Sequence, residues 1–237
     1  MKWLLLRRVL LAAAVLAPMA AHLAPTAAHA QDRGTFLVIV GSDTVFVERF
    51  TRTADSVAVQ AELKGQARMQ YTLLTAAQSA VTEINLRMWP ADAAPSAPPA
   101  QVGRVVFSGD VATTTLDAGG GPREATVPNA RGALPMLNPS PVMIEQVLMR
   151  ARALSPRDSV SVPVLVLGRP QTVSATVRWV GADSAVMSIG PVEVHARIDA
   201  AGRMQSASVP SQNLTIVRTA EARAAAPAKP KDALAAR

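Results

Sequence analysis

The chain has 237 residues, with 24 Lys or Arg against 17 Asp or Glu, and it contains no Cys. The absence of Cys excludes disulfides, thiolate metal sites and a Cys nucleophile. Nucleic-acid binding calls for a basic stripe with aromatic stacking residues. Because aromatic residues make up only 3% of the chain and the basic residues are scattered, we expect no nucleic-acid partner.

Residues 1–30 have the pattern of a cleaved secretory signal peptide. A basic start is followed by an apolar run and then by Ala28-His29-Ala30, an A-x-A cleavage pattern. A membrane anchor is the competing interpretation, but Pro18 and Pro25 break the run before the roughly 20 apolar residues that a span needs. We therefore expect a mature chain that starts near Gln31, a periplasmic or secreted location, and no membrane span after cleavage.

The first half of the mature chain alternates apolar and polar residues with period two, which is typical of strands. Short links between these segments predict antiparallel pairing, because parallel strands need long crossovers. A Pro- and Ala-rich surface loop at 90–101 interrupts the series. The predicted strands are 35–40, 44–51, 56–63, 68–75 and 81–89, then 102–108, 111–116 and a short 123–127.

One amphipathic helix is predicted at about 141–153. Ser140 is a good N-cap, and Pro141 stands at the first helical position, where its missing N–H costs nothing. The segment before it, 128–138, reads as irregular. The apolar stripe of the helix is Ile144, Val147, Leu148, Ala151 and Leu154.

A second series of strands follows the helix, and the chain ends in an Ala-, Lys- and Pro-rich tail at 219–237, which we expect to be disordered. We predict one mainly β domain at 31–218: an antiparallel curved sheet or half-barrel built from two meanders, with the helix packed against it. Two small sheets divided near 128–140 are the alternative. The later strands are predicted at 159–167, 171–180, 185–189, 191–199, 204–209 and 214–217.

The sequence shows no known catalytic arrangement. His195 is the one His beyond residue 30, and it takes an outward position on a predicted strand. There is no G-x-S-x-G, H-E-x-x-H or P-loop motif. We therefore predict no catalytic residues, no metal site and no cofactor. An enzyme with an unfamiliar site remains the rival hypothesis; it would require Glu48, Glu83, Tyr71 and His195 to converge in one pocket.

The apolar side chains indicate a candidate binding site for an apolar ligand. Met is common on adaptable binding surfaces, and a helix across a curved sheet can leave an apolar cleft. An ordinary filled core is the alternative explanation of the same residues. The residues predicted to bind an apolar ligand are Phe46, Phe50, Met69, Tyr71, Met88, Met143, Val147 and Trp179.

The order of elements resembles a family. The chain has an exported N-terminus, a meander, a Pro-rich loop, a helix after Leu137-Asn138-Pro139-Ser140-Pro141 and a second meander. This order is similar to periplasmic lipoprotein-carrier-like folds and to exported bacterial β domains of that shape. The stretch from Ile198 through Gly202 to Val209-Pro210 resembles the close of such domains. The resemblance implies a half-barrel whose apolar concave face, covered by helices, accepts acyl chains.

The sequence thus predicts an exported, non-enzymatic binding domain. Its expected partner is an apolar small molecule, a lipid or acyl chain, or an envelope protein, held on the face between sheet and helix. A structural or assembly module of the cell envelope is a further alternative.

Overall fold

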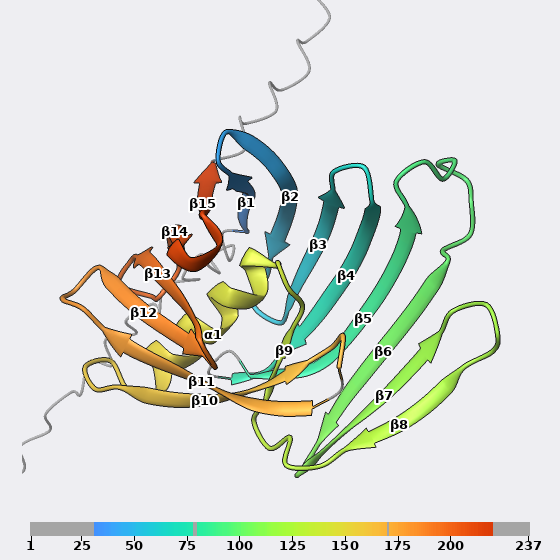
Figure 1. Cartoon of the computed structure of the whole chain (residues 1–237). Helices are drawn as coiled ribbons and strands as arrows, with labels where there is room; N and C mark the ends of the chain where they lie inside the picture. The colour runs from blue at the N-terminus through green and yellow to red at the C-terminus, as the bar shows by residue number, and fades with distance from the viewer. Residues whose placement is uncertain (1–30, 78–79, 170, 220–237) are drawn as a thin grey trace, which may run out of the picture.

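The computed structural model describes residues 31–77, 80–169 and 171–219, and in them 15 strands join in one sheet. The strand order is β8-β7-β6-β5-β4-β3-β2-β1-β15-β14-β13-β12-β11-β10-β9 (Figure 1). Both predicted meanders therefore belong to the same sheet. The predicted signal peptide and nearly all of the predicted tail lie outside the described residues; Thr219 is the last residue of β15.

The first meander contains β1 (Asp32–Val40), β2 (Asp43–Arg52), β3 (Ser56–Leu63), β4 (Ala67–Thr75), β5 (Val81–Pro90), β6 (Gln101–Ser108), β7 (Val111–Asp117) and β8 (Arg123–Val127). The short β9 (Leu134–Met136) and the helix α1 (Pro141–Leu154) follow. The second meander contains β10 (Val160–Val166), β11 (Gln171–Trp179), β12 (Ser184–Ile189), β13 (Val192–Ile198), β14 (Met204–Val209) and β15 (Leu214–Thr219).

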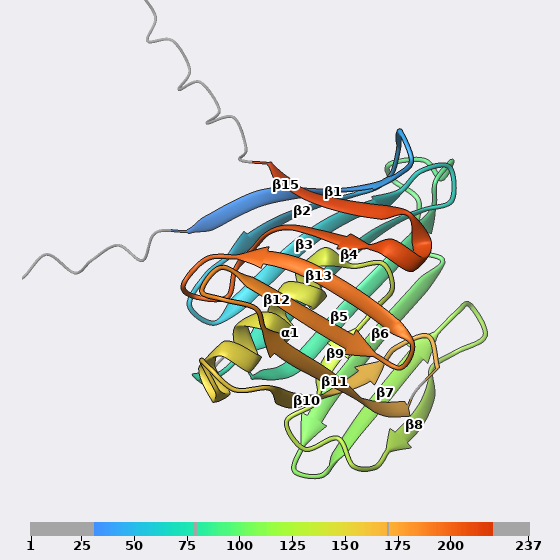
Figure 2. The same ribbon diagram turned by 60° about the vertical axis from the view of Figure 1, so that its left-hand side comes forward.

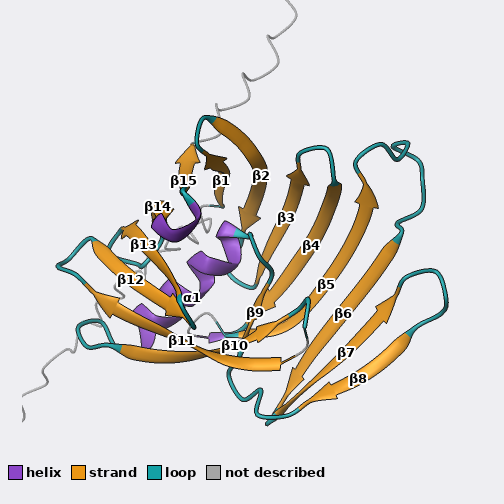
Figure 3. Cartoon of the chain, viewed as in Figure 1, coloured by secondary structure: helices purple, strands orange, loops and turns teal. Residues whose placement is uncertain are grey.

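The fold prediction is confirmed: the protein is mostly β, with a large curved antiparallel sheet that does not close into a barrel and one α-helix packed inside it (Figure 3). A short 3-10 helix, η2 (Pro210–Gln212), links β14 to β15. A strand lies at every predicted position. β9 was not expected, because its three residues are too few to show alternation and include Pro135. It runs parallel to β10, whereas the other pairings between described strands are antiparallel.

The two halves of the sheet meet where the first strand pairs with the last. β1 and β15 run side by side and antiparallel, with Thr35 opposite Thr219 and Val40 opposite Leu214 (Figure 2). This seam brings the two ends of the described chain together, and it places β2 and β15 on either side of β1.

The inner face of the sheet, the face toward α1, carries the core. Alternate residues of β2 point inward, among them Phe46 and Phe50, and both are buried. Phe50 stacks on Phe36 of β1 with ring centroids 5.4 Å apart. The helix was expected to bury one stripe, but every residue from Pro141 to Leu148 is buried, so its first two turns are enclosed on all sides.

Ser140 caps the helix as predicted: its Oγ accepts a hydrogen bond from the N–H of Met143 at 3.1 Å. The far part of the helix meets the turn between β13 and β14. Gly202 in this turn has φ +80°, and a Cβ there would lie 3.1 Å from the backbone oxygen of Leu148 and 3.1 Å from Cα of Met149. The turn thus touches the helix backbone directly, which a side chain would prevent.

Gly202→Ala should therefore cost more stability than the same change at a glycine in open space. Gly190 is the matched control, because it has φ +55° and its Cβ would meet nothing within 4 Å. We expect Gly190→Ala to lower the free energy of unfolding by about 1–2 kcal/mol, the cost of left-handed backbone for a non-glycine residue. Gly202→Ala should lower it by a further ~1–3 kcal/mol through overpacking. Equal losses in urea titrations would contradict this contact.

Candidate functional site

Most of the eight residues predicted to bind an apolar ligand lie in the hydrophobic core. Met88 on β5 and Trp179 on β11 are only half-buried. The other six are at most 6% exposed: Phe46, Phe50, Met69, Tyr71, Met143 and Val147.

The space between the helix and the sheet is filled at its centre. Phe46 on the sheet and Met143 and Leu148 on the helix are among the largest fully buried side chains. Trp179 lies at the other end of the helix, where its Nε1 donates to the backbone oxygen of Ser155 at 2.7 Å and the guanidinium of Arg152 sits 4.1 Å above its ring. A ligand at the central residues would have to displace packed side chains, and their role in binding stays a prediction.

A buried carboxylate on β2 holds the N-terminus of the helix. Glu48 is 0% exposed and accepts hydrogen bonds from the hydroxyl of Tyr71 on β4 and from Oγ of Ser140, the latter at 2.9 Å. Its Oε2 accepts from the backbone N–H of Val142 at 2.7 Å. Because the first N–H groups of a helix have no partner within the helix, Glu48 satisfies one of them and lies at the positive end of the helix dipole.

Burial raises the pKa of Glu48 to about 7, although the hydrogen bonds from Tyr71, Val142 and Ser140 lower it, and the nearby Glu145 raises it further. The same burial, together with Glu48, raises the pKa of Tyr71 well above its ordinary value. The carboxyl of Glu48 thus binds a proton more tightly in the folded protein than in the unfolded chain.

Stability should consequently depend on pH through Glu48. Because the folded state holds this proton more tightly, the free energy of unfolding contributed by Glu48 should fall as pH rises from about 4.5 to about 7 and then level off. A shift of this size corresponds to about 3 kcal/mol. The measurement is a series of urea titrations from pH 4 to 8 on the wild type and Glu48→Gln, which cannot ionise.

Glu83→Gln is the control for the loss of one carboxylate. Hydrogen bonding to Arg104 lowers the pKa of Glu83 to about 2, so its contribution is lost only as pH falls below about 4.5, opposite in sign to that of Glu48. Between pH 4.5 and 7, the free energy of unfolding of Glu83→Gln should change with pH as that of the wild type does. A constant difference between wild type and Glu48→Gln over that range would rule out the role assigned to Glu48.

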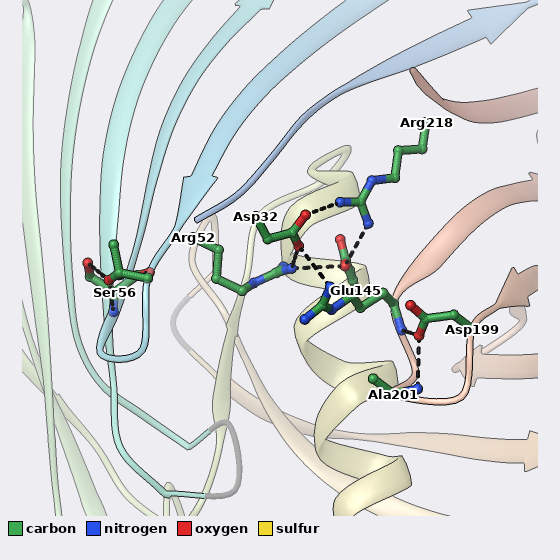
Figure 4. Close-up of polar contacts among 9 residues, drawn as sticks. Asp32, Arg52, Ser56, Glu145, Asp199, Ala201 and Arg218 are labelled. Carbon is green, nitrogen blue, oxygen red and sulfur yellow. Dashed lines mark hydrogen bonds and ion pairs between the residues drawn. The ribbon is translucent and has the colours of Figure 1, made fainter. Parts of the chain in front are cut away.

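A second polar cluster joins the helix to the seam of the sheet (Figure 4). Asp32 of β1 pairs with Arg52 of β2 at 2.7 Å and also with Arg218 of β15. Both arginines reach Glu145 of the helix, Arg52 at 3.2 Å and Arg218 at 3.6 Å. Arg203 approaches Asp32 at 3.9 Å. The side chain of Glu145 is 0% exposed, and burial raises its pKa while Arg52 and Arg218 oppose the rise.

The four residues of the rival enzyme hypothesis do not meet in one pocket. Glu48 and Tyr71 are hydrogen-bonded to each other on the inner face of the sheet. Glu83 is on the outer face of β5, where it pairs with Arg104 at 2.8 Å. His195 is on β13, exposed, with its Nε2 3.4 Å from Glu193. Among the described residues, no group of three or more His, Cys, Asp or Glu side chains could hold a metal ion.

Part of the inner face remains open beyond the helix. Leu86 of β5, Gly103 of β6 and Leu116 of β7 are direct neighbours across the strands. Leu116 is 48% exposed, and Leu86 and the nearby Met88 are half-buried. We call these four residues the inner strip. It begins beside Tyr71, which pairs with Leu86 and contacts Ser140, so it lies near the N-terminus of the helix.

Comparison with known proteins shows the fold alone. No family model and no curated protein matches the chain. A crystal structure of a DUF1089 family protein from Pseudomonas aeruginosa is similar with a TM-score of 0.52 and 15% identity, over 72% of this chain and 92% of that one. A β-barrel-like protein of the domain of unknown function DUF1849 from Brucella abortus aligns with a TM-score of 0.48 and 8% identity, over 80% of this chain and 95% of that one.

The likeness to the DUF1089 family protein, at 15% identity, concerns the fold alone. The finer resemblance to lipoprotein carriers finds no support in it. Within the residues that the structure describes, no helix has the length and apolar character to cross a membrane.

Proposed function

We propose that the protein is an exported, non-enzymatic binding domain that holds an apolar ligand, such as the acyl chain of a lipid, on the inner face of its sheet. The observation that carries the proposal is the inner strip: Leu86, Met88 and Leu116 offer apolar side chains to solvent at the margin of the core. Export, to the periplasm or the medium, rests on the signal pattern of residues 1–30.

The shape of the strip suits a narrow chain. Gly103 lies between Leu86 and Leu116 and adds no side chain, and an added Cβ would only just touch them, at 3.7 and 3.8 Å. The space between the two leucines therefore holds no side chain from β6. Met88 lies two residues along from Leu86 and pairs with the buried Met69 of β4, so flexible thioethers lie between the strip and the core.

The polar groups nearest to the strip serve the fold. Tyr71 donates to Glu48 and also contacts Ser140, which holds the helix start in place. These side chains form a fixed wall beside the inner strip. An apolar chain lying against them would exclude water from the half-buried leucine and methionine, which is the driving force for such binding.

A charge placed on the strip should weaken the binding of an apolar probe. We expect Leu116→Glu to weaken the binding of a fluorescent fatty acid at least tenfold, because the carboxylate would have to be desolvated beneath the acyl chain. The readout is a fluorescence titration. Val111→Glu is the matched control: it changes an exposed apolar residue of the same strand, 37% exposed, on the opposite face.

The control variant should bind the probe as the wild type does. If the wild type binds no fatty acid at any concentration, or if both variants lose binding equally, the inner strip is not the site and the proposal fails.

A further inference from the structure

The outer face of the sheet, opposite to the helix, is hollowed across β2 to β6. A recess of about 850 Å³ lies there, a volume within the range of ligand sites. The pairing of the strands aligns two rows of outward side chains across it. The first row is Arg49, Gln60, Gln70 and Arg87, and the second is Thr51, Ala58, Thr72, Asn85 and Arg104.

The recess is positively charged. Arg33, Arg49, Arg87 and Arg104 line it, and no acidic residue is among the lining residues. Arg104 is engaged by Glu83 at 2.8 Å. Arg49 and Arg87 are exposed and make no hydrogen bond or ion pair with the described residues. Two free guanidinium groups thus flank the amides of Gln60 and Gln70.

The spacing of the row suits an extended ligand. Arg49 and Arg87 are separated by three strand-to-strand steps, or about 14 Å. A smaller recess of about 210 Å³ adjoins the first and shares Arg49, Gln60 and Gln70 with it, and its lining adds Arg68 and Glu62. The outer groove, as we call the two recesses together, runs across the strands rather than ending in a closed pocket.

The chemistry of the outer groove favours an acidic polysaccharide. Guanidinium groups bind carboxylates in a bidentate manner, and side-chain amides both donate and accept, as sugar hydroxyls require. Bases of a nucleic acid need aromatic side chains for stacking. Neither row contains one, and Trp89, which lines the smaller recess, is half-buried and donates its Nε1 hydrogen to the backbone oxygen of Ala97 at 2.9 Å. A flat lipid surface does not match a hollowed face.

We propose that the outer groove binds a carboxylated polysaccharide, with Arg49 and Arg87 pairing with its carboxylates and Gln60 and Gln70 hydrogen-bonding to its hydroxyls. The side chains of both rows point away from the inner strip, although Leu86 and Gly103 of that strip also line the recess. The two proposed sites take chemically different partners.

The test measures binding of polygalacturonate by calorimetry or affinity electrophoresis. Arg49→Gln with Arg87→Gln should raise the Kd at least tenfold, and the remaining binding should depend less on salt. Arg178→Gln is the matched control, because Arg178 is an exposed arginine on β11 outside the outer groove; its Kd should stay within twofold. The melting curves of the arginine variants should coincide with that of the wild type, because none of these arginines makes a hydrogen bond or ion pair with the described residues that the substitution would remove.

A second variant separates recognition from general charge attraction. Gln60→Leu with Gln70→Leu keeps every charge, and it should weaken polygalacturonate binding severalfold while leaving weak polyphosphate binding unchanged. Leu116→Glu should leave polygalacturonate binding intact. The proposal is overturned if polygalacturonate does not bind, if the double arginine variant binds as the control does, or if single-stranded DNA or anionic vesicles bind as tightly as polygalacturonate.

Discussion

The cost of burying charge beside the helix is the constraint on which the rest of the structure depends. The first two turns of α1 are enclosed on all sides, so polar groups there must find partners within the protein. Glu48 comes from the sheet to the start of the helix, and Glu145 leaves the helix toward the sheet. Each carboxylate is fully buried. Glu48 accepts three hydrogen bonds, whereas Glu145 accepts one from Arg52 and pairs with Arg218, and its Oε2 has no hydrogen-bond partner among the described residues.

The two buried carboxylates, Glu48 and Glu145, both lie close to the seam of the sheet. Glu48 and Arg52 lie on the inner face of the same strand, β2, and Arg218 comes from β15 on the other side of β1. Asp32 of β1 bridges the two arginines. The arginines also lie over Phe50, at 5.3 Å for Arg52 and 5.1 Å for Arg218. One helix therefore fixes the two meanders to each other where they join.

This arrangement explains where the two proposed binding surfaces lie. The strands of the first meander that are farthest from the seam lie beyond the helix. The inner strip belongs to β5, β6 and β7 for this reason. On the outer side, β2 to β6 carry polar residues in register, and these residues line the outer groove.

Most of the strands and the helix could be predicted from alternation and capping, but the roles of the buried carboxylates Glu48 and Glu145 could not. Ser140 and Pro141 marked the helix start because the capping signal is local. Glu48 was considered as part of the rival enzyme site, although it falls between Phe46 and Phe50 at the inward parity of β2; that parity was the signal that could have placed it in the core.

Glu145 and Arg218 are 73 positions apart in the numbering of the chain, and only the pairing of β1 with β15 brings them together. Such a contact leaves no local pattern. The eight predicted binding residues show the same limit, since apolar residues of a filled core and of a cleft have the same periodicity. Met88 alone among them lies on the open inner strip.

The most direct test of this account is a double-mutant cycle between Arg52 and Glu145, measured as the free energy of unfolding in urea. The variants are Arg52→Met, Glu145→Gln and both together. If the buried pair locks the helix to the seam, each single change is strongly destabilising and the double variant recovers part of the loss, with a coupling energy of about 1.5–3 kcal/mol. Additive effects, with a coupling below about 0.5 kcal/mol, would contradict it.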